Sequence, residues 1–220
     1  MPRIARVVVP DYPHHIVQRG NRRQKVFFNE NDYNEYLKLL GEYTKRFKVD
    51  ILAYCLMPNH VHLVVTPRQQ GNLARAIGET HRNYTRFINF REKWQGYLWQ
   101  GRFSSYVLDE RHLLAVIRYI LLNPVKAKIV TKPWDYIYSS AQHHLRINGN
   151  SLVKDDLLQE LIDNWKGFLA VFPTDGDVEL LRLHERTGRP LGDNHFIEKL
   201  EDILKINLKK KKAGRKKKKD

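Results

Sequence analysis

The chain has 220 residues, of which 42% are hydrophobic, so it can bury a sizeable core and is too apolar to be wholly disordered. Its formal net charge is +15, and a charge of +7 remains when the lysine-rich residues 209–220 are left out. This excess predicts a polyanionic partner, most commonly nucleic acid. An anionic membrane is the weaker interpretation, because no basic amphipathic helix with a strong apolar face stands out.

The single cysteine, Cys55, excludes a disulfide within the chain and a zinc site built from several cysteines. It falls in an apolar run, which predicts a free buried thiol. The first residues lack the apolar core of a signal peptide, and no run approaches the roughly 18 apolar residues of a membrane-spanning helix. We therefore expect a cytoplasmic protein without a membrane partner.

The predicted elements begin with a strand at residues 14–19 and a basic turn at residues 20–24. A helix is predicted next, because apolar residues recur at helical spacing from residue 33 to residue 47, and residues 29–31 can cap its start. Residues 50–57 and 60–66 predict two strands that form a hairpin through a tight turn at Pro58 and Asn59. Their almost continuous apolar character favours a central place in the sheet.

A long amphipathic helix is predicted to start at Gly71 and Asn72, with His81 on its surface, and to end before residues 94–97. Residues 98–108 then read as the next strand or strand pair. The resulting order, β-α-β-β-α-β, predicts an α+β fold with a ferredoxin-like antiparallel sheet.

A further helix is predicted from residue 111 to about residue 123, capped by Asp109 and ended by Pro124, because a residue before proline disfavours the helical conformation. Beyond residue 146 the composition changes, and residues 151–166, 177–185 and 193–208 read as helical. This gives a first domain at residues 1–145, a helical accessory region at 146–208 and a disordered lysine-rich tail at 209–220. The accessory region is either a helix-turn-helix-like unit or a helical cap packed on the first domain.

Two histidines stand out in the strand that follows Pro58 and Asn59. His60 and His62 are two residues apart, so their side chains share one face of the strand, while Val61, Leu63 and Val65 point into a core on the other face. Two imidazoles make only part of a site for Mg²⁺ or Mn²⁺, which also needs oxygen ligands or water. Alone, such a pair is more often structural than functional.

The helix after Asp109 carries a second pair. Tyr119 and Asn123 are four residues apart and are therefore neighbours on one helical face. They offer a phenol nucleophile and an amide oxygen one turn apart. A tyrosine on a helix is usually a packing residue, so this pair is also weak alone. Both pairs together, in a basic chain with a ferredoxin-like order, indicate a functional site.

These residues carry a family resemblance. The sequence Met-Pro-Asn-His-Val-His at residues 57–62 resembles the His-hydrophobic-His motif of the HUH single-tyrosine transposases. Residues 118–125 resemble the catalytic tyrosine helix of the REP-associated tyrosine transposases, and residues 98–103 and 134–140 are also similar to that family. The resemblance covers roughly residues 5–145; the later residues match extensions of longer relatives less closely.

The resemblance implies a DNA transposase that cleaves and rejoins single-stranded or hairpin DNA. His60, His62 and Asn123 would hold a divalent metal, Mg²⁺ or Mn²⁺, that polarises a phosphate oxygen. Tyr119 would attack the phosphorus in line, forming a 5′-phosphotyrosine and releasing a 3′-hydroxyl. A second transesterification would rejoin the strands, and no ATP is needed because one phosphodiester is exchanged for another.

The basic residues have a matching use. Arg19, Arg22, Arg23 and Arg102 are expected to bind DNA phosphates, and Trp99, or else Phe103 or Tyr106, to stack on unpaired bases. Some relatives exchange the tyrosine helix between the two subunits of a dimer, so the sequence leaves open a monomer or a homodimer.

Two other interpretations stay open at this point. One is a non-catalytic nucleic-acid-binding protein, since ferredoxin-like sheets with exposed aromatic residues commonly bind RNA, although no RRM signature occurs. The other is a metal-dependent nuclease that uses water, in which Tyr119 is merely structural.

Overall fold

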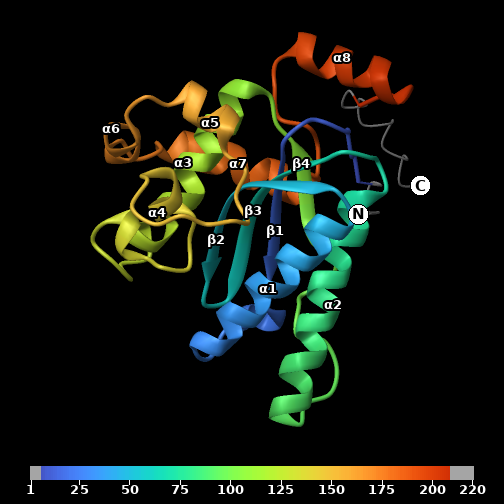
Figure 1. Ribbon diagram of the computed structural model, residues 1–220. Coiled ribbons are helices and arrows are strands. Elements are labelled where there is room, and N and C mark those ends of the chain that lie inside the picture. Colours follow the sequence, from blue (N-terminus) through green and yellow to red (C-terminus); the bar gives the residue numbers. More distant parts are fainter. Residues whose placement is uncertain (1–5, 209–220) are drawn as a thin grey trace, which may run out of the picture.

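A four-stranded antiparallel sheet forms the centre of the computed structural model, which describes residues 6–208 (Figure 1). The strands are β1 (His14–Arg19), β2 (Val49–Met57), β3 (His60–Pro67) and β4 (Ser104–Val107), and they lie in the order β2-β3-β1-β4. Helix α1 (Glu30–Arg46) joins β1 to β2, and α2 (Asn72–Glu92) joins β3 to β4. The predicted α+β, ferredoxin-like order is confirmed.

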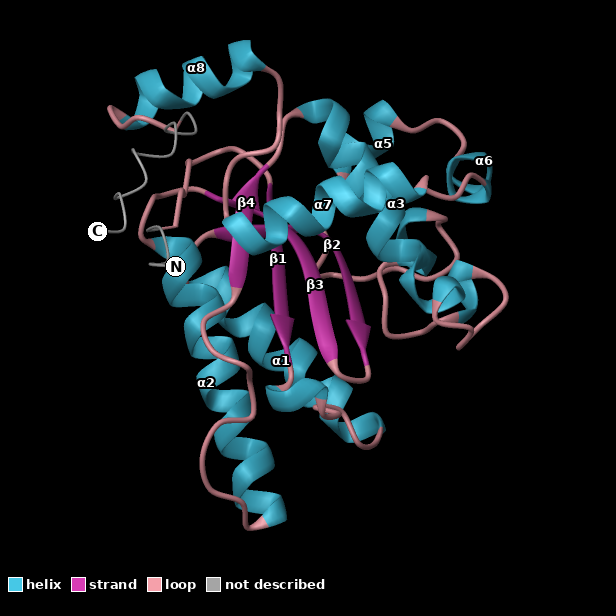
Figure 2. Cartoon of the chain, turned by 180° about the vertical axis from the view of Figure 1, so that it is seen from behind, coloured by secondary structure: helices cyan, strands magenta, loops and turns pink. Residues whose placement is uncertain are grey.

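The two faces of the sheet are covered by different helices. Helices α1 and α2 cover one face, where Val61, Leu63 and Val65 enter the core as predicted (Figure 1). Helices α3 (Glu110–Lys126) and α7 (Asp175–Thr187) lie on the other face (Figure 2). Because strand residues alternate between faces, His60 and His62 point toward α3 and α7.

The hairpin of β2 and β3 forms as predicted, but only β3 has the central place expected for both strands. Strand β2 lies at the edge of the sheet, and later chain covers that edge: the Ser140 amide donates to the Tyr54 carbonyl, and the Lys154 amide donates to the Ile51 carbonyl. The apolar character of β2 therefore reflects burial on both faces and along its edge. Cys55 is a free buried cysteine, as predicted, and burial raises the pKa of its thiol.

The start of α3 is predicted correctly and its end is not. The Asp109 side chain accepts a hydrogen bond from the His112 amide and caps the helix, which then continues through Pro124 to Lys126. Proline removes one helical amide, but the last turn is closed by hydrogen bonds from Ala127 to the Asn123 carbonyl and from Ile129 to the Pro124 carbonyl, both 2.9 Å. These bonds explain why Pro124 does not end the helix.

Three further predictions of extent are wrong. Residues 98–108 supply only β4, and Trp99 forms a single bridge with Gly20. Residues 151–166 do not form one helix: the chain is extended at Ile162, and Asn164 caps a new helix by accepting from the Gly167 amide. The last helix stops at Leu204 rather than at residue 208. The tail at 209–220 lies outside the described residues.

The remaining helices are short and belong mostly to the region after α3: η1 (Asn21–Arg23), η2 (Pro133–Asp135), α4 (Ala141–His144), α5 (Asp156–Leu161), α6 (Trp165–Ala170) and α8 (Asn194–Leu204). Leu158, Trp165, Val178 and Leu181 pack in the same apolar cluster as Val64 of the sheet. Helices α5, α6 and α7 therefore share the core on the α3 side of the sheet. Among residues 6–208, the helices are too short or too polar to cross a membrane.

Candidate active site

The site is built on the face of the sheet that α3 and α7 cover. In the register of β1 and β3, Val17 lies opposite His62 and Arg19 lies opposite His60. Strand alternation therefore brings His15, Val17 and Arg19 to the same face as the two histidines. The rings of His60 and His62 lie 4.8 Å apart between centroids, at 83° to each other.

Tyr119 meets this pair from α3. Its ring lies edge-on to that of His62, with a centroid distance of 5.7 Å and an interplanar angle of 86°. Ile117 and Ile120, its neighbours on the helix, are fully buried in the core against the sheet, which fixes how α3 lies. The tyrosine and the histidine thus come together within one chain, and this contact does not require a helix from a second subunit.

Asn123 lies one helical turn beyond Tyr119. Its Nδ2 donates to the Tyr119 backbone carbonyl at 3.2 Å. The Oδ1 atom, which would be the metal ligand, takes no part in this bond. Within residues 6–208, no hydrogen bond or ring contact joins Asn123 to His60 or His62. The structure thus brings three of the four predicted residues into contact and places the fourth, Asn123, one helical turn from Tyr119.

The hydrogen bonds of the two histidines leave one nitrogen of each imidazole available. The Nδ1 of His60 lies 2.6 Å from the Asn59 Oδ1, which can only accept, so His60 carries its proton on Nδ1. The Nδ1 of His62 lies 3.0 Å from the Nε2 of His15, whose own Nδ1 lies 2.8 Å from the Tyr106 hydroxyl. The Nε2 of His62 is buried, and no group in the described chain bonds to it.

A buried nitrogen without a partner is rare, and a divalent metal would satisfy it. Among residues 6–208, His, Cys, Asp and Glu side chains form no group of three that could hold a metal. A metal held by the two imidazoles would therefore need oxygen ligands other than carboxylates, such as the Asn123 amide, a DNA phosphate or water. Such a ligand set suits Mg²⁺ or Mn²⁺. The donors of the site fit such an ion.

Both histidines are held neutral by their surroundings. Burial, with a smaller effect of the Arg19 charge, lowers the pKa of His60 to about 3. Burial also lowers the pKa of His62 well below the ordinary value, and His60, His15 and Arg19 lower it further. Neutral imidazoles keep the lone pair that a metal ligand needs.

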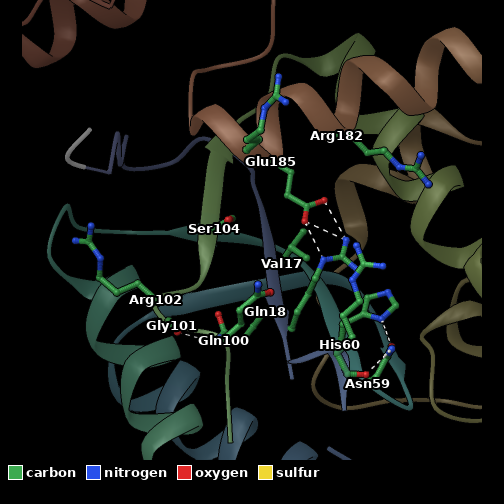
Figure 3. A pocket seen from close by; sticks show the side chains of 13 residues that line it. Val17, Gln18, Asn59, His60, Gln100, Gly101, Arg102, Ser104, Arg182 and Glu185 are labelled. Atoms are coloured by element: carbon green, nitrogen blue, oxygen red, sulfur yellow. Dashed lines mark hydrogen bonds and ion pairs between the residues drawn. The ribbon is translucent and has the colours of Figure 1, made fainter. Parts of the chain in front are cut away.

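A cavity of about 860 Å³ opens beside His60 (Figure 3). Figure 3 shows Glu185 projecting from α7 into this space, with Arg182 on the same helix. The cavity is lined mainly by polar and basic side chains from β1, η1, the turn between β2 and β3, the segment before β4, and α7: Arg19, Arg23, Asn59, Gln100, Arg102, Arg182, Glu185 and Arg186. An opening with this charge suits a polyanion.

The arginines predicted to bind DNA have different positions. Arg19, Arg23 and Arg102 line the cavity, whereas Arg22 is exposed on η1 and does not line it. Arg19 is also paired with Glu185, its Nη2 lying 3.0 Å from the carboxylate Oε1. Three of the four predicted arginines therefore surround one opening.

The predicted stacking role of Trp99 is not supported. Its side chain is 7% exposed, packs against Tyr36 and Tyr84, and donates its indole N–H to the His81 carbonyl at 3.3 Å. Phe103 and Tyr106 are buried as well. Segment 98–103 folds over α1 and α2, so its aromatic residues complete the core and offer no open ring face to a base.

The prediction that His81 lies on the surface of α2 is wrong. The ring is buried, and its Nε2 is hydrogen-bonded to the Tyr36 hydroxyl at 3.0 Å. Burial lowers the pKa of His81 to about 3. Helix α2 is covered on two sides, by α1 and by the segment that contains Trp99, so its buried face is wider than its apolar residues indicate.

Sequence reasoning missed four residues that belong to the site: His15, Arg182, Glu185 and Arg186. The place of His15 follows from its spacing of two and four residues from Val17 and Arg19, but only once the register of β1 with β3 is known. Arg182, Glu185 and Arg186 lie on one face of α7. Helical spacing groups these three residues, but it does not tell that α7 packs against the sheet beside His60.

Comparison with solved structures identifies the class of fold. The structure of a REP-associated tyrosine transposase bound to a REP hairpin superposes with a TM-score of 0.58 and 17% sequence identity, covering 70% of this chain and 98% of that chain. A putative transposase from Deinococcus radiodurans R1 matches with a TM-score of 0.38 and 20% identity, over 54% of this chain and 95% of that chain. The first of these superpositions shows that this chain shares the fold of that REP-associated tyrosine transposase.

The family is established by the sequence itself. Residues 8–123 match the family described as "Transposase IS200 like", which is more than half of the chain. The protein belongs to this family of transposases. A search of curated proteins found no match. The matched residues end at Asn123, so α7 and the other helices after α3 lie outside the family match.

Proposed function

We propose that this protein is a metal-dependent DNA strand transferase that cleaves and rejoins single-stranded or hairpin DNA through a tyrosine. The observation that carries the proposal is the edge-on contact of Tyr119 with His62, whose buried Nε2 has no partner in the described chain. A nucleophile beside a nitrogen that can bind a metal is the arrangement that this phosphoryl transfer requires.

The residues of the site take separate roles in this proposal. His60, His62 and Asn123 would hold Mg²⁺ or Mn²⁺, which polarises a phosphate oxygen and offsets the charge of the transition state. The Tyr119 oxygen would attack phosphorus in line, forming the phosphotyrosine bond as the bond to the 3′-oxygen breaks. Attack by a 3′-hydroxyl on that phosphotyrosine would reverse the exchange and free Tyr119. The Asn59 oxygen would keep His60 oriented.

The substrate is inferred from charge and from the structural neighbour. Arg19, Arg23 and Arg102 would bind phosphates of a strand that passes His60 through the cavity, and Arg22 would extend this contact outside it. The similar transposase is bound to a REP hairpin, so hairpin DNA is the substrate to test first. The DNA sequence that is recognised is a separate question.

The proposal is tested by detecting the covalent bond between Tyr119 and DNA. A labelled hairpin oligonucleotide with a single-stranded extension is incubated with the protein and Mg²⁺ or Mn²⁺, then run on a denaturing gel. We expect a denaturation-resistant adduct that is lost in Tyr119→Phe and on chelation of the metal. Tyr97→Phe is the matched control, because Tyr97 is 85% exposed and does not line the cavity, and it should form the adduct normally.

Other outcomes favour the other interpretations. Binding without any cleavage would indicate a non-catalytic nucleic-acid-binding protein. Metal-dependent cleavage that survives Tyr119→Phe would indicate a nuclease that uses water, and would remove Tyr119 from the chemistry.

A further inference from the structure

Helix α7 forms one side of the cavity that contains His60. It lies across the sheet face opposite α1 and α2 (Figure 2) and contacts β4 and α3. Val178 and Leu181 are 3% exposed and fix the helix to the core, while Arg182 and Arg186 are exposed and line the cavity. The two arginines are four residues apart and so share one helical face.

An ion pair ties this helix to the strand beside the candidate metal site. The Nε and Nη2 of Arg19 donate to the Glu185 Oε1 at 3.2 and 3.0 Å. Arg19 lies opposite His60 in the register of β1 and β3. The polar face of α7 is therefore held next to the histidine by a contact that is independent of its apolar side.

The charges around the cavity are strongly unbalanced. Among the described residues that line it there are five arginines (Arg19, Arg23, Arg102, Arg182 and Arg186) and one carboxylate, Glu185. Arginine binds phosphate with a planar, bidentate group, and a row of arginines across an opening suits a nucleic-acid backbone. Two of the five come from α7, which lies outside the residues that match the transposase family.

We propose that α7 is the second wall of the DNA-binding groove, where Arg182 and Arg186 bind backbone phosphates of the strand that passes His60. The ligand of this wall is single-stranded DNA, or the single-stranded extension of a hairpin, so the inference rests on the proposed function for the identity of the ligand. It assigns to the C-terminal helices a part in substrate binding in addition to their part in the core.

Binding is measured by fluorescence anisotropy with a labelled hairpin that has a single-stranded extension, using the full chain with Tyr119→Phe, which cannot form the adduct. The double substitution Arg182→Ala and Arg186→Ala is expected to weaken binding about tenfold and to reduce the slope of log affinity against log salt by about 1.4, about 0.7 per lost phosphate contact on a single strand. Circular dichroism and thermal melting establish that both chains are folded.

The matched control removes the same charge elsewhere. Arg75→Ala with Lys166→Ala changes two exposed basic residues that do not line the cavity, and binding should stay within about twofold of the parent. If the α7 double variant binds DNA as tightly as this control, or if the parent does not bind DNA at all, the inference is wrong.

Glu185→Gln tests the sign of the electrostatic effect. It removes the one negative charge among the described cavity residues and releases Arg19, while Val178 and Leu181 still anchor α7. Binding should become about threefold tighter. Unchanged or weaker binding would contradict a phosphate-accepting role for this wall.

The inference and the proposed function fail in different ways. If no tyrosine adduct forms but the α7 arginines are needed for binding, α7 binds DNA as proposed and the tyrosine mechanism is wrong. If the adduct forms and the α7 arginines make no difference to binding, the tyrosine mechanism is supported and the DNA-binding role of α7 is wrong.

Discussion

The hydrogen bonds of His62 decide whether it can bind a metal. For its Nε2 to keep a free lone pair, the proton must lie on Nδ1 and be donated to the Nε2 of His15, 3.0 Å away. His15 must then carry its own proton on Nδ1 and donate it to the Tyr106 oxygen, at 2.8 Å. His15 and Tyr106 would thus orient a ligand without touching the metal, as outer partners of metal-binding histidines do.

Substituting His15 should therefore weaken metal binding. His15→Phe removes the acceptor for the His62 Nδ1–H, and we expect Mn²⁺ affinity, measured by isothermal titration calorimetry, to fall about tenfold or more. His195→Phe, which removes an exposed imidazole from α8, is the control and should leave the affinity unchanged. Equal affinities for the two variants would show that His15 does not orient the ligand.

Trp99 provides a second test at the level of one residue, because sequence and structure assign it different roles. Its burial against Tyr36 and Tyr84 predicts that Trp99→Ala lowers the free energy of unfolding by about 3–5 kcal/mol, measured by urea denaturation. Trp99→Phe, which keeps most of the packing, should bind the hairpin as the parent does. A folded Trp99→Phe variant with a large loss of DNA affinity would restore the stacking role.

These residues show how far the sequence predicts the site. The shared face of His60 and His62 and the adjacency of Tyr119 and Asn123 follow from the periods of a strand and a helix, so each pair could be predicted. The contact between Tyr119 and His62 depends on how α3 packs on the sheet, and only the resemblance to a known family suggested it. Residues such as His15 enter the site through strand register, which the local sequence does not specify.

Among the elements, α1 is held at its start by contacts both within and beyond the helix. Asn29 and Asp32 form a capping box, in which Asp32 Oδ2 also accepts from the Phe28 amide at 2.7 Å. Asp32 is fully buried and is paired with Arg91 from the last turn of α2. One carboxylate therefore caps α1 and joins it to α2.

Replacing this carboxylate should be costly for the whole fold. Asp32→Ala leaves two amides without their acceptor and Arg91 without its partner, so we expect a loss of about 3 kcal/mol in the free energy of unfolding. Glu35→Ala, on the same helix, removes only a surface pair with Lys38 and should cost less than about 1 kcal/mol. Chemical denaturation of both variants measures the difference, and similar losses would contradict the assigned role.

The ends of the elements were predicted well where a local signal sets them and poorly where packing does. Capping residues fixed the starts of α1 and α3, since a cap acts through side chains next to the helix in sequence. The continuation of α3 through Pro124 depends on the hydrogen bonds of Ala127 and Ile129 beyond the proline, and the break at Ile162 accompanies the burial of that side chain. A proline or a run of apolar residues does not show which contacts compensate for a lost helical hydrogen bond.

At the scale of the molecule, several histidines are buried without charge, and this should make stability depend on pH. Burial lowers the pKa of His14 to about 4 and that of His81 to about 3. Between these values and the ordinary histidine pKa of about 6.5, the unfolded chain binds more protons than the folded chain, so stability is highest above pH 6.5 and falls as the pH falls.

The urea midpoint should therefore decrease steeply from pH 7.5 to pH 5. His81→Gln removes one of the groups that take up a proton on unfolding, and its midpoint should depend less on pH than that of the parent. Tyr36 can still hydrogen-bond to the new amide, which limits the direct loss of stability. A parent midpoint that is flat over this range would contradict neutral burial of these histidines.

Both edges of the sheet are closed by chain that comes late in the sequence. Residues 138–140 and 153–154 pair with β2, and the Leu191 amide donates to the Val107 carbonyl on the outer side of β4 at 2.8 Å. A ribosome must therefore synthesise most of the chain before either edge is protected. Until then the nascent sheet offers two rows of unpaired amides and carbonyls to other chains, which is the usual starting point of aggregation. We therefore expect a product that ends at residue 145, which lacks Val153, Lys154 and Leu191, to leave both edges partly unpaired and to aggregate more readily than the full chain.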